Sequence, residues 1–215
     1  MLEGNRECGT RHKFAVKIRD LAPNLYPDEV ARLAHWCAVF DSEGMAPVEG
    51  GASAGNLSFR TSRGFVITAT RSLLKTGLGW RDFVEVVRED WLDYELHVLG
   101  ERVPSSDSFL HARIYALRPD VGAVFHGHDD LVLEHADSLA RELDLVSTEE
   151  AMLFGTREDA VETARALGKS DYIIRKGHGF VAVGRTLDLA GARALAVHRR
   201  AKDKASPSGR GRSMP

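Results

Sequence analysis

The sequence lacks several features that would assign it to a specialised class of protein. Two cysteines, Cys8 and Cys37, form no C-x-x-C pair and make no disulfide framework. No apolar run approaches the roughly 20 residues of a membrane-spanning helix, and the N-terminus, MLEGNRECGTRHK, lacks the apolar segment of a secretory signal. A formal net charge of −2 argues against a nucleic-acid-binding surface. These absences predict a soluble, cytoplasmic protein without membrane or nucleic-acid partners.

What is present indicates one globular domain. The chain has 215 residues, of which 43% are hydrophobic, so it can bury a substantial core. Residues 13–204 contain no internal repeat and no linker, and we predict that they form a single domain. Residues 1–12 are polar and expected to be loose, and residues 205–215 are rich in Ser, Gly and Arg and expected to be disordered.

Apolar periodicity predicts an α/β fold in this domain. Helices are expected at residues 26–45, 105–120, 130–145, 157–169 and 187–204. Strands are expected at residues 13–21, 56–61, 64–70, 82–90, 94–100 and 121–128, and on either side of 177–179 within 171–184. The stretch 46–55 is Gly-rich and is predicted to be a flexible loop. We therefore expect a mainly antiparallel sheet with helices on both faces.

One expected strand ends in two histidines. The apolar residues 123–125 precede His126, Gly127 and His128 in the stretch AVFHGHDD. Side chains two apart on a strand share one face, so the two imidazoles point the same way, and two imidazoles can ligate one divalent metal at about 2.0–2.1 Å. An isolated H-x-H is more often a pair of surface histidines. Metal binding therefore requires a further ligand and an open coordination position.

A second interrupted strand offers that ligand. His178 lies between Gly177 and Gly179 in RKGHGFVAVG, and glycine on both sides suits a bend or the close approach of a bound group. His126, His128 and His178 would leave positions for substrate or water, which is the arrangement of a catalytic metal site.

The ordered motifs resemble a known family. The stretches SAGNLSFR, ITAT, PSSDSFLHARIYALRPDVGAVFHGH, FGTRE and IIRKGHGFVAVG together resemble the class II aldolase/adducin family, from about Asp28 to Ala201. This family includes fuculose-phosphate aldolase and ribulose-phosphate 4-epimerase. The resemblance implies a three-layer α/β/α sandwich, a homotetramer, and one divalent metal per chain. A three-histidine site suits zinc, with manganese or cobalt as alternatives.

The resemblance also assigns roles to residues. It matches the metal ligands to His126, His128 and His178, and the acidic group beside the metal to Asp107. It places phosphate contacts at Gly55, Asn56, Thr70, Ser105 and Ser106. Arg71 stands where a phosphate loop usually has glycine, and we predict that it also contacts the substrate, since a guanidinium can bind an anion through two hydrogen bonds. The same residue types also suit structural roles: Asp107 suits a helix N-terminus, Asn56 and the serines suit turns and caps, and Arg71 could fill the pocket or be a surface charge.

The implied activity is that of a metal-dependent aldolase acting on a small sugar phosphate or related hydroxy-carbonyl compound through a metal-stabilised enediolate. However, the region LDLVSTEEAML and the C-terminal segment lack the tyrosines found in these positions in aldolases. The reaction therefore stays open between an aldolase, a 4-epimerase, a dehydratase and a non-catalytic metal-binding member of the family.

Overall fold

The central element of the structure is one large sheet. The computed structural model describes residues 14–19, 24–74, 77–148 and 155–206. Within these residues the sheet has the strand order β1-β7-β6-β5-β4-β8-β11-β10-β9. The strands are β1 (Ala15–Arg19), β4 (Gly55–Arg60), β5 (Phe65–Thr68), β6 (Phe83–Asp90), β7 (Glu95–Leu99), β8 (Ala123–Gly127), β9 (Val146–Ser147), β10 (Tyr172–Arg175) and β11 (Gly179–Gly184). Only the outermost pairs, β1 with β7 and β9 with β10, are parallel, so the prediction of a mainly antiparallel sheet is confirmed.

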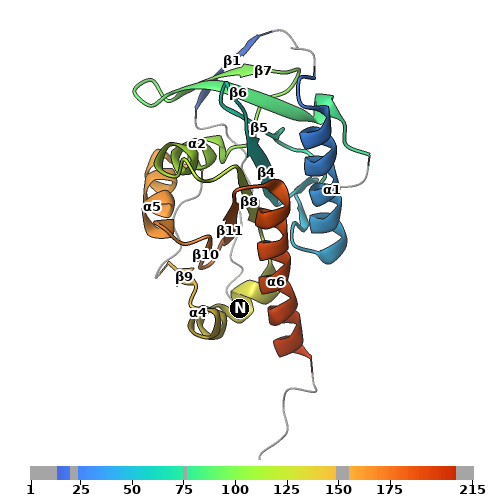
Figure 1. Ribbon diagram of the computed structural model, residues 1–215, viewed down its shortest axis with the longest axis vertical. Helices are drawn as coiled ribbons and strands as arrows, with labels where there is room; N and C mark the ends of the chain where they lie inside the picture. Colours follow the sequence, from blue (N-terminus) through green and yellow to red (C-terminus); the bar gives the residue numbers. More distant parts are fainter. Residues whose placement is uncertain (1–13, 20–23, 75–76, 149–154, 207–215) are drawn as a thin grey trace, which may run out of the picture.

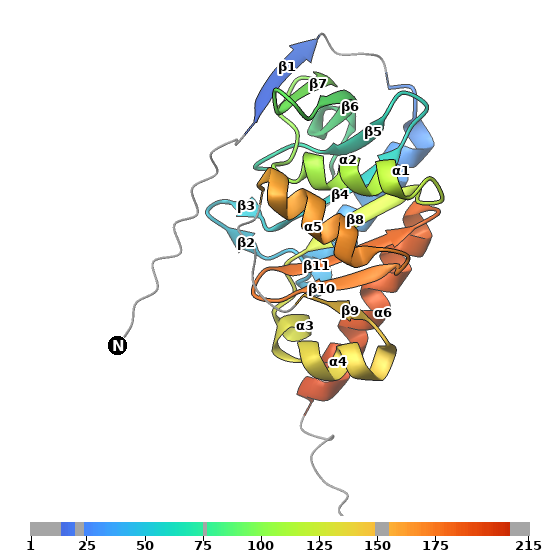
Figure 2. The same cartoon turned by 90° about the vertical axis from the view of Figure 1, so that its left-hand side faces the viewer.

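Helices cover both faces of this sheet (Figures 1 and 2). On one face lie α1 (Pro27–Glu43) and α6 (Leu187–Ala205), and on the other α2 (Ser108–Leu117) and α5 (Arg157–Leu167). The short helices α3 (Asp130–Glu134) and α4 (Ala136–Leu143) pack beside α6 near β9. Each of the two helical layers packs on the sheet through its own buried apolar cluster, which confirms the three-layer α/β/α sandwich.

Strand β8 occupies the middle of the sheet between β4 and β11. Its apolar residues are fully buried because alternate side chains enter the two different cores: Phe125 contacts Phe40 of α1, and Val124 belongs to the cluster on the α2 side. Truncating Phe125 to alanine would cost roughly 3–5 kcal/mol of stability. The histidines at the end of β8 are therefore carried by a buried strand that is paired on both sides.

Glycines allow the backbones to approach closely at this end of β8. A Cβ added to Gly127 would lie 2.5 Å from the Met45 carbonyl oxygen, and one added to Gly179 would lie 2.3 Å from the Gly127 carbonyl oxygen. Neither position has room for a side chain. The glycines beside the histidines thus allow close packing of the backbones at this end of β8, in agreement with the interpretation of the sequence.

Two local predictions were wrong. The Gly-rich stretch 46–55 contains a hairpin of β2 (Val48–Glu49) and β3 (Ala52–Ser53), because Gly50 and Gly51 adopt positive φ angles of 56° and 82°, as a tight hairpin turn requires. The helix expected at 130–145 is divided into α3 and α4 at His135. Its buried residues keep helical spacing across the break, so periodicity alone does not reveal it.

The ends of the domain differ slightly from the prediction. Helix α6 continues to Ala205, one residue into the predicted disordered tail, while residues 1–13 and 207–215 lie outside the described residues. In the described part of the chain, no helix is long and apolar enough to cross a membrane. The buried Cys37 in α1 is a core thiol, and burial raises its pKa.

Candidate metal centre

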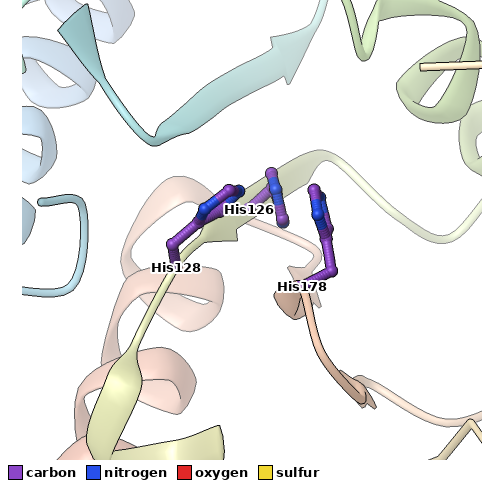
Figure 3. Close-up of side chains that lie close together, drawn as sticks. All are labelled: His126, His128 and His178. Carbon is purple, nitrogen blue, oxygen red and sulfur yellow. The ribbon is translucent and has the colours of Figure 1, made fainter. Parts of the chain in front are cut away.

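Three histidines from two segments of the chain meet at the end of β8 (Figure 3). His126 lies in β8, His128 directly follows that strand, and His178 precedes β11, the neighbouring strand. One ring nitrogen of each lies within 4.8 Å of those of the other two. The rings of His126 and His178 are nearly parallel, with centroids 4.9 Å apart. The structure therefore brings the three predicted ligands together.

The hydrogen bonding of His126 leaves one nitrogen available for a metal. Its Nδ1 donates to the Phe180 carbonyl oxygen at 2.7 Å, so the proton of the neutral ring is on Nδ1. Nε2 is buried and has no hydrogen-bond partner among the described residues. Such a nitrogen is costly to bury unless something binds it. A bound divalent cation would satisfy Nε2, so the donor set fits a metal ion.

The pKa values of all three histidines favour the neutral, metal-binding form. Burial lowers the pKa of His126 well below its usual value and also lowers that of His128. Burial and the charge of Arg175 lower the pKa of His178 to about 3. Neutral imidazoles at pH 7 can ligate a metal without first losing a proton, and three such ligands leave coordination positions open.

Asp107 is the acidic group of this centre. It is buried, its Oδ2 lies 3.5 Å from His126 Nε2, and the same oxygen accepts a hydrogen bond from Asn56 Nδ2 at 2.9 Å. Burial acts to raise the pKa of Asp107, but the neighbouring His126, Arg175 and His178 and the Asn56 hydrogen bond outweigh it and lower the pKa. Asp107 is therefore ionised at neutral pH, within reach of anything bound to the histidines.

Asp107 and Asn56 are placed by the sheet and by the start of α2. Asn56 pairs with His126 across β4 and β8, which puts its side chain beside the histidines. The predicted helix 105–120 begins at Ser108, and neither Ser105 nor Ser106 caps it. Asp107 occupies the N-cap position without making a side-chain capping bond, so its carboxylate faces the site instead.

All of the predicted site residues line one cavity. The wall of this cavity includes the following predicted residues: Gly55, Asn56, Thr70, Arg71, Ser105, Ser106, Asp107, His126, His128 and His178. In two of the residues expected to contact phosphate, the backbone N–H group is already used: that of Thr70 donates to the Val103 carbonyl oxygen, and that of Ser105 to the Thr68 carbonyl oxygen. The exposed Arg71 side chain and the hydroxyl groups of the cavity wall are further donors that can face a bound anion.

Several residues of the site were missed at the sequence level. Ser72 lines the cavity, and its buried hydroxyl has no hydrogen-bond partner in the part of the chain that the structure describes. Glu49 also lines the cavity, 3.9 Å from His128 Nδ1. Arg175 is buried behind the site and pairs with Asp159 of α5. Arg175 was visible as a lone charge in the apolar run YIIR, whereas the others had no local signal.

His111 does not line the cavity but is buried in α2, close to it. It is fully buried, and its Nδ1 lies 2.7 Å from Ser58 Oγ, which in turn lies 2.8 Å from the Tyr115 hydroxyl. Burial lowers the pKa of His111 to about 4. His111 follows Asp107 by one helical turn, and its backbone N–H donates to the Asp107 carbonyl oxygen, so it packs close to the site.

Comparison with known proteins identifies the class that this fold and site define. Residues 31–204 match the family model described as Class II Aldolase and Adducin N-terminal domain. The chain therefore belongs to the class II aldolase and adducin family.

Characterised relatives cover part of the chain. A 5-methylthioribulose-1-phosphate/5-deoxyribulose-1-phosphate aldolase of Rhodospirillum rubrum is 33% identical over 150 residues, which are 64% of this chain and 64% of that protein, less than two thirds of its length. A methylthioribulose-1-phosphate dehydratase of Gluconacetobacter diazotrophicus is 32% identical over 66% of this chain and 77% of that protein. Among solved structures, the L-fuculose-1-phosphate aldolase of Thermus thermophilus superposes with a TM-score of 0.67, covering 86% of this chain and 98% of that chain. At 21% identity, that likeness concerns the fold alone.

Proposed function

We propose that this protein is a divalent-metal-dependent carbon–carbon lyase that cleaves a small sugar phosphate or a related hydroxy-carbonyl compound. The observation that carries the proposal is the set of three neutral histidines beside the ionised Asp107, in a cavity that also holds Arg71. Membership of a family with sugar-phosphate aldolases and dehydratases supports the same reaction class.

Different side chains would have different roles in such a reaction. A divalent ion held by His126, His128 and His178 would act as a Lewis acid on the carbonyl and hydroxyl oxygens of the substrate. Asp107 is placed to move a proton between substrate atoms, and Asn56 orients it by donating to Oδ2. Arg71 and the hydroxyls of Thr70, Ser72 and Ser106 would receive the anionic end of the substrate, since guanidinium groups bind phosphate oxygens in pairs.

A dehydratase is the second candidate. The similarity to the methylthioribulose-1-phosphate dehydratase favours it. Both reactions use a metal-polarised carbonyl and a carboxylate that moves a proton, so the site suits either. They differ in the bond that breaks: a carbon–carbon bond in the aldolase, and a carbon–oxygen bond with release of water in the dehydratase. We further propose zinc as the metal and a homotetramer as the assembly, as the family resemblance implies.

Metal analysis and a substrate panel test this proposal. Purified wild-type protein should hold about one transition-metal ion per chain, His126→Ala should hold none, and the control His35→Ala, on the exposed side of α1, should match the wild type. The panel contains 5-methylthioribulose 1-phosphate, 5-deoxyribulose 1-phosphate and L-fuculose 1-phosphate. Release of a triose phosphate identifies an aldolase, loss of water a dehydratase, and inversion at one carbon an epimerase. Full metal content without turnover on any of these would support a non-catalytic family member, and no metal would overturn the proposal.

A further inference from the structure

The three candidate ligands do not receive equal support from the sheet. His126 lies within β8, and both neighbouring strands pair with it, through Asn56 of β4 and Val181 of β11. His128 lies beyond the last residue of β8. Its backbone N–H donates to the Ala54 carbonyl oxygen at 3.1 Å, which fixes the chain on one side only. A ligand outside the sheet needs a second constraint, because a metal site tolerates deviations of only about 0.5 Å.

Asp129, the next residue, supplies a constraint on the other side. Its side chain is almost completely buried, and both carboxylate oxygens are engaged. Oδ1 accepts hydrogen bonds from the N–H groups of Leu131 and Val132 at 3.1 and 3.2 Å, which caps helix α3. Oδ2 accepts a hydrogen bond from His198 Nδ1 at 2.7 Å. The residue that follows the ligand is therefore held by two different elements.

The contact with His198 is more than a helix cap requires. Serine or asparagine caps a helix as well as aspartate does, without the cost of burying a charge. Among the described residues, the second oxygen of Asp129 accepts its hydrogen bond from His198, which is itself buried in the middle of α6. His198 Nε2 points toward Glu43 at the end of α1, at 3.7 Å. The pair thus connects the segment after β8 to the helical layer behind it.

We propose that the His198–Asp129 pair positions His128 for metal binding, so that helix α6 supports the candidate metal centre. His198 is a positioning residue: it acts through Asp129 and the main chain on the preceding residue, without touching the metal or the substrate. The proposal rests on the proposed function, since it concerns the metal of that site. Residues that orient metal ligands typically change metal affinity by 10–100-fold when they are removed.

Helix α6 also provides a matched control. Its Asp188 accepts a hydrogen bond from the Trp36 indole of α1 at 2.9 Å, a second tether between helices that lies far along α6 from His198. Asp188→Ala loosens α6 without any link to the histidines. His198→Gln keeps a side-chain N–H that can donate to Asp129, and Asp129→Asn keeps the cap of α3 while altering the oxygen that faces His198.

The experiment measures zinc affinity by competition with a chromophoric chelator, and the visible spectrum of the cobalt-loaded protein, at a temperature where circular dichroism shows each variant folded. We expect His198→Ala to weaken zinc binding by about 10–100-fold and to change the intensity of the cobalt bands. His198→Gln should recover part of the affinity and Asp129→Asn should lose part of it. Asp188→Ala should lower the melting temperature but bind zinc as the wild type does.

Two outcomes overturn the proposal in distinguishable ways. If His198→Ala binds zinc and cobalt as the wild type does, while losing stability as Asp188→Ala does, the pair is only structural and the metal centre stands. If the wild type binds no metal, the proposed function fails together with the positioning role. Should His198→Ala fail to fold, the comparison of His198→Gln and Asp129→Asn with the wild type decides, and unchanged affinity in both refutes the role.

Discussion

The two ends of the candidate cavity are built in different ways. At the metal end, the buried His126 and Asp107 come from β8 and from the start of α2, and each is held by a hydrogen bond. At the other end, Thr70, Arg71 and Ser72 follow β5 in a segment without regular structure. There Arg71 is exposed and has a positive φ of 55°, which is unusual for a residue other than glycine.

Under the proposed function, this difference would separate the residues that carry the chemistry from those that recognise the substrate. Groups that bind a metal or move a proton must be placed accurately, and rigid elements place them better than loops do. Groups that select a substrate can lie on loops, whose residues change without disturbing the core. We therefore expect substitutions at the metal end to affect turnover, and substitutions at the loop end to affect substrate binding.

Asp107→Asn tests the metal end and should have the largest effect. Asparagine keeps the size of the side chain but cannot take up a proton at neutral pH. Loss of a positioned acid–base group typically lowers turnover by about 10²–10⁴-fold. We expect kcat to fall within this range while the metal content stays at the wild-type level. An unchanged kcat in the metal-loaded variant would remove Asp107 from the mechanism.

The buried His111, one helical turn after Asp107, can be tested through the pH dependence of stability. Burial lowers its pKa to about 4, below the value of about 6.5 in the unfolded chain, so acid favours unfolding. The stabilisation from this group is present above pH 6.5 and is lost as the pH falls toward 4, by up to about 3 kcal/mol. The free energy of unfolding, measured with urea in the presence of a chelator, should fall less steeply with decreasing pH for His111→Gln than for the wild type. The same dependence of the free energy of unfolding on pH in both proteins would contradict the lowered pKa of His111.

The metal end was largely predictable from the sequence, for physical reasons. The apolar residues of β8 indicated a buried strand, and strand geometry put His126 and His128 on one side. The glycines beside them signalled close backbone approach, which Gly127 and Gly179 show. These signals are local, so a single sequence contains them.

The supports of the site were not predictable in the same way. His198 had no partner that the sequence could indicate, yet it binds Asp129, 69 positions away. Arg175 and Asp159 likewise meet only because α5 packs over β10. Contacts between elements distant in the chain depend on the tertiary arrangement, which periodicity and capping signals do not specify. Likewise, the sequence does not show that the backbone N–H group of Thr70, a residue expected to contact phosphate, is used within the fold.

Arg71→Ala tests the loop end and should have an intermediate effect. A hydrogen bond to a charged group contributes about 1.5–3 kcal/mol, which corresponds to a rise in KM of roughly 10–150-fold for a phosphorylated substrate. Metal content should not change, and an unphosphorylated analogue should be processed as by the wild type. The control is Arg81→Ala, another exposed arginine, which pairs with Glu101. Equal effects on both substrates would show that Arg71 does not contact the phosphate.

Ser72→Ala should have the smallest effect. It removes a single hydroxyl group and shows whether that group contributes to substrate binding or to the stability of the protein. The Ser72 hydroxyl is buried in the cavity wall without a partner among the described residues, a state that costs stability unless a ligand satisfies it. Removing it should leave the melting temperature of the free protein unchanged or slightly higher. KM for the phosphorylated substrate should rise by about 2–10-fold, because a neutral hydrogen bond contributes about 0.5–1.5 kcal/mol. Ser42→Ala, on the exposed surface of α1, is the control and should change neither quantity. A lower melting temperature with an unchanged KM would instead make Ser72 a part of the scaffold, and the loop end would lose one of its proposed contacts.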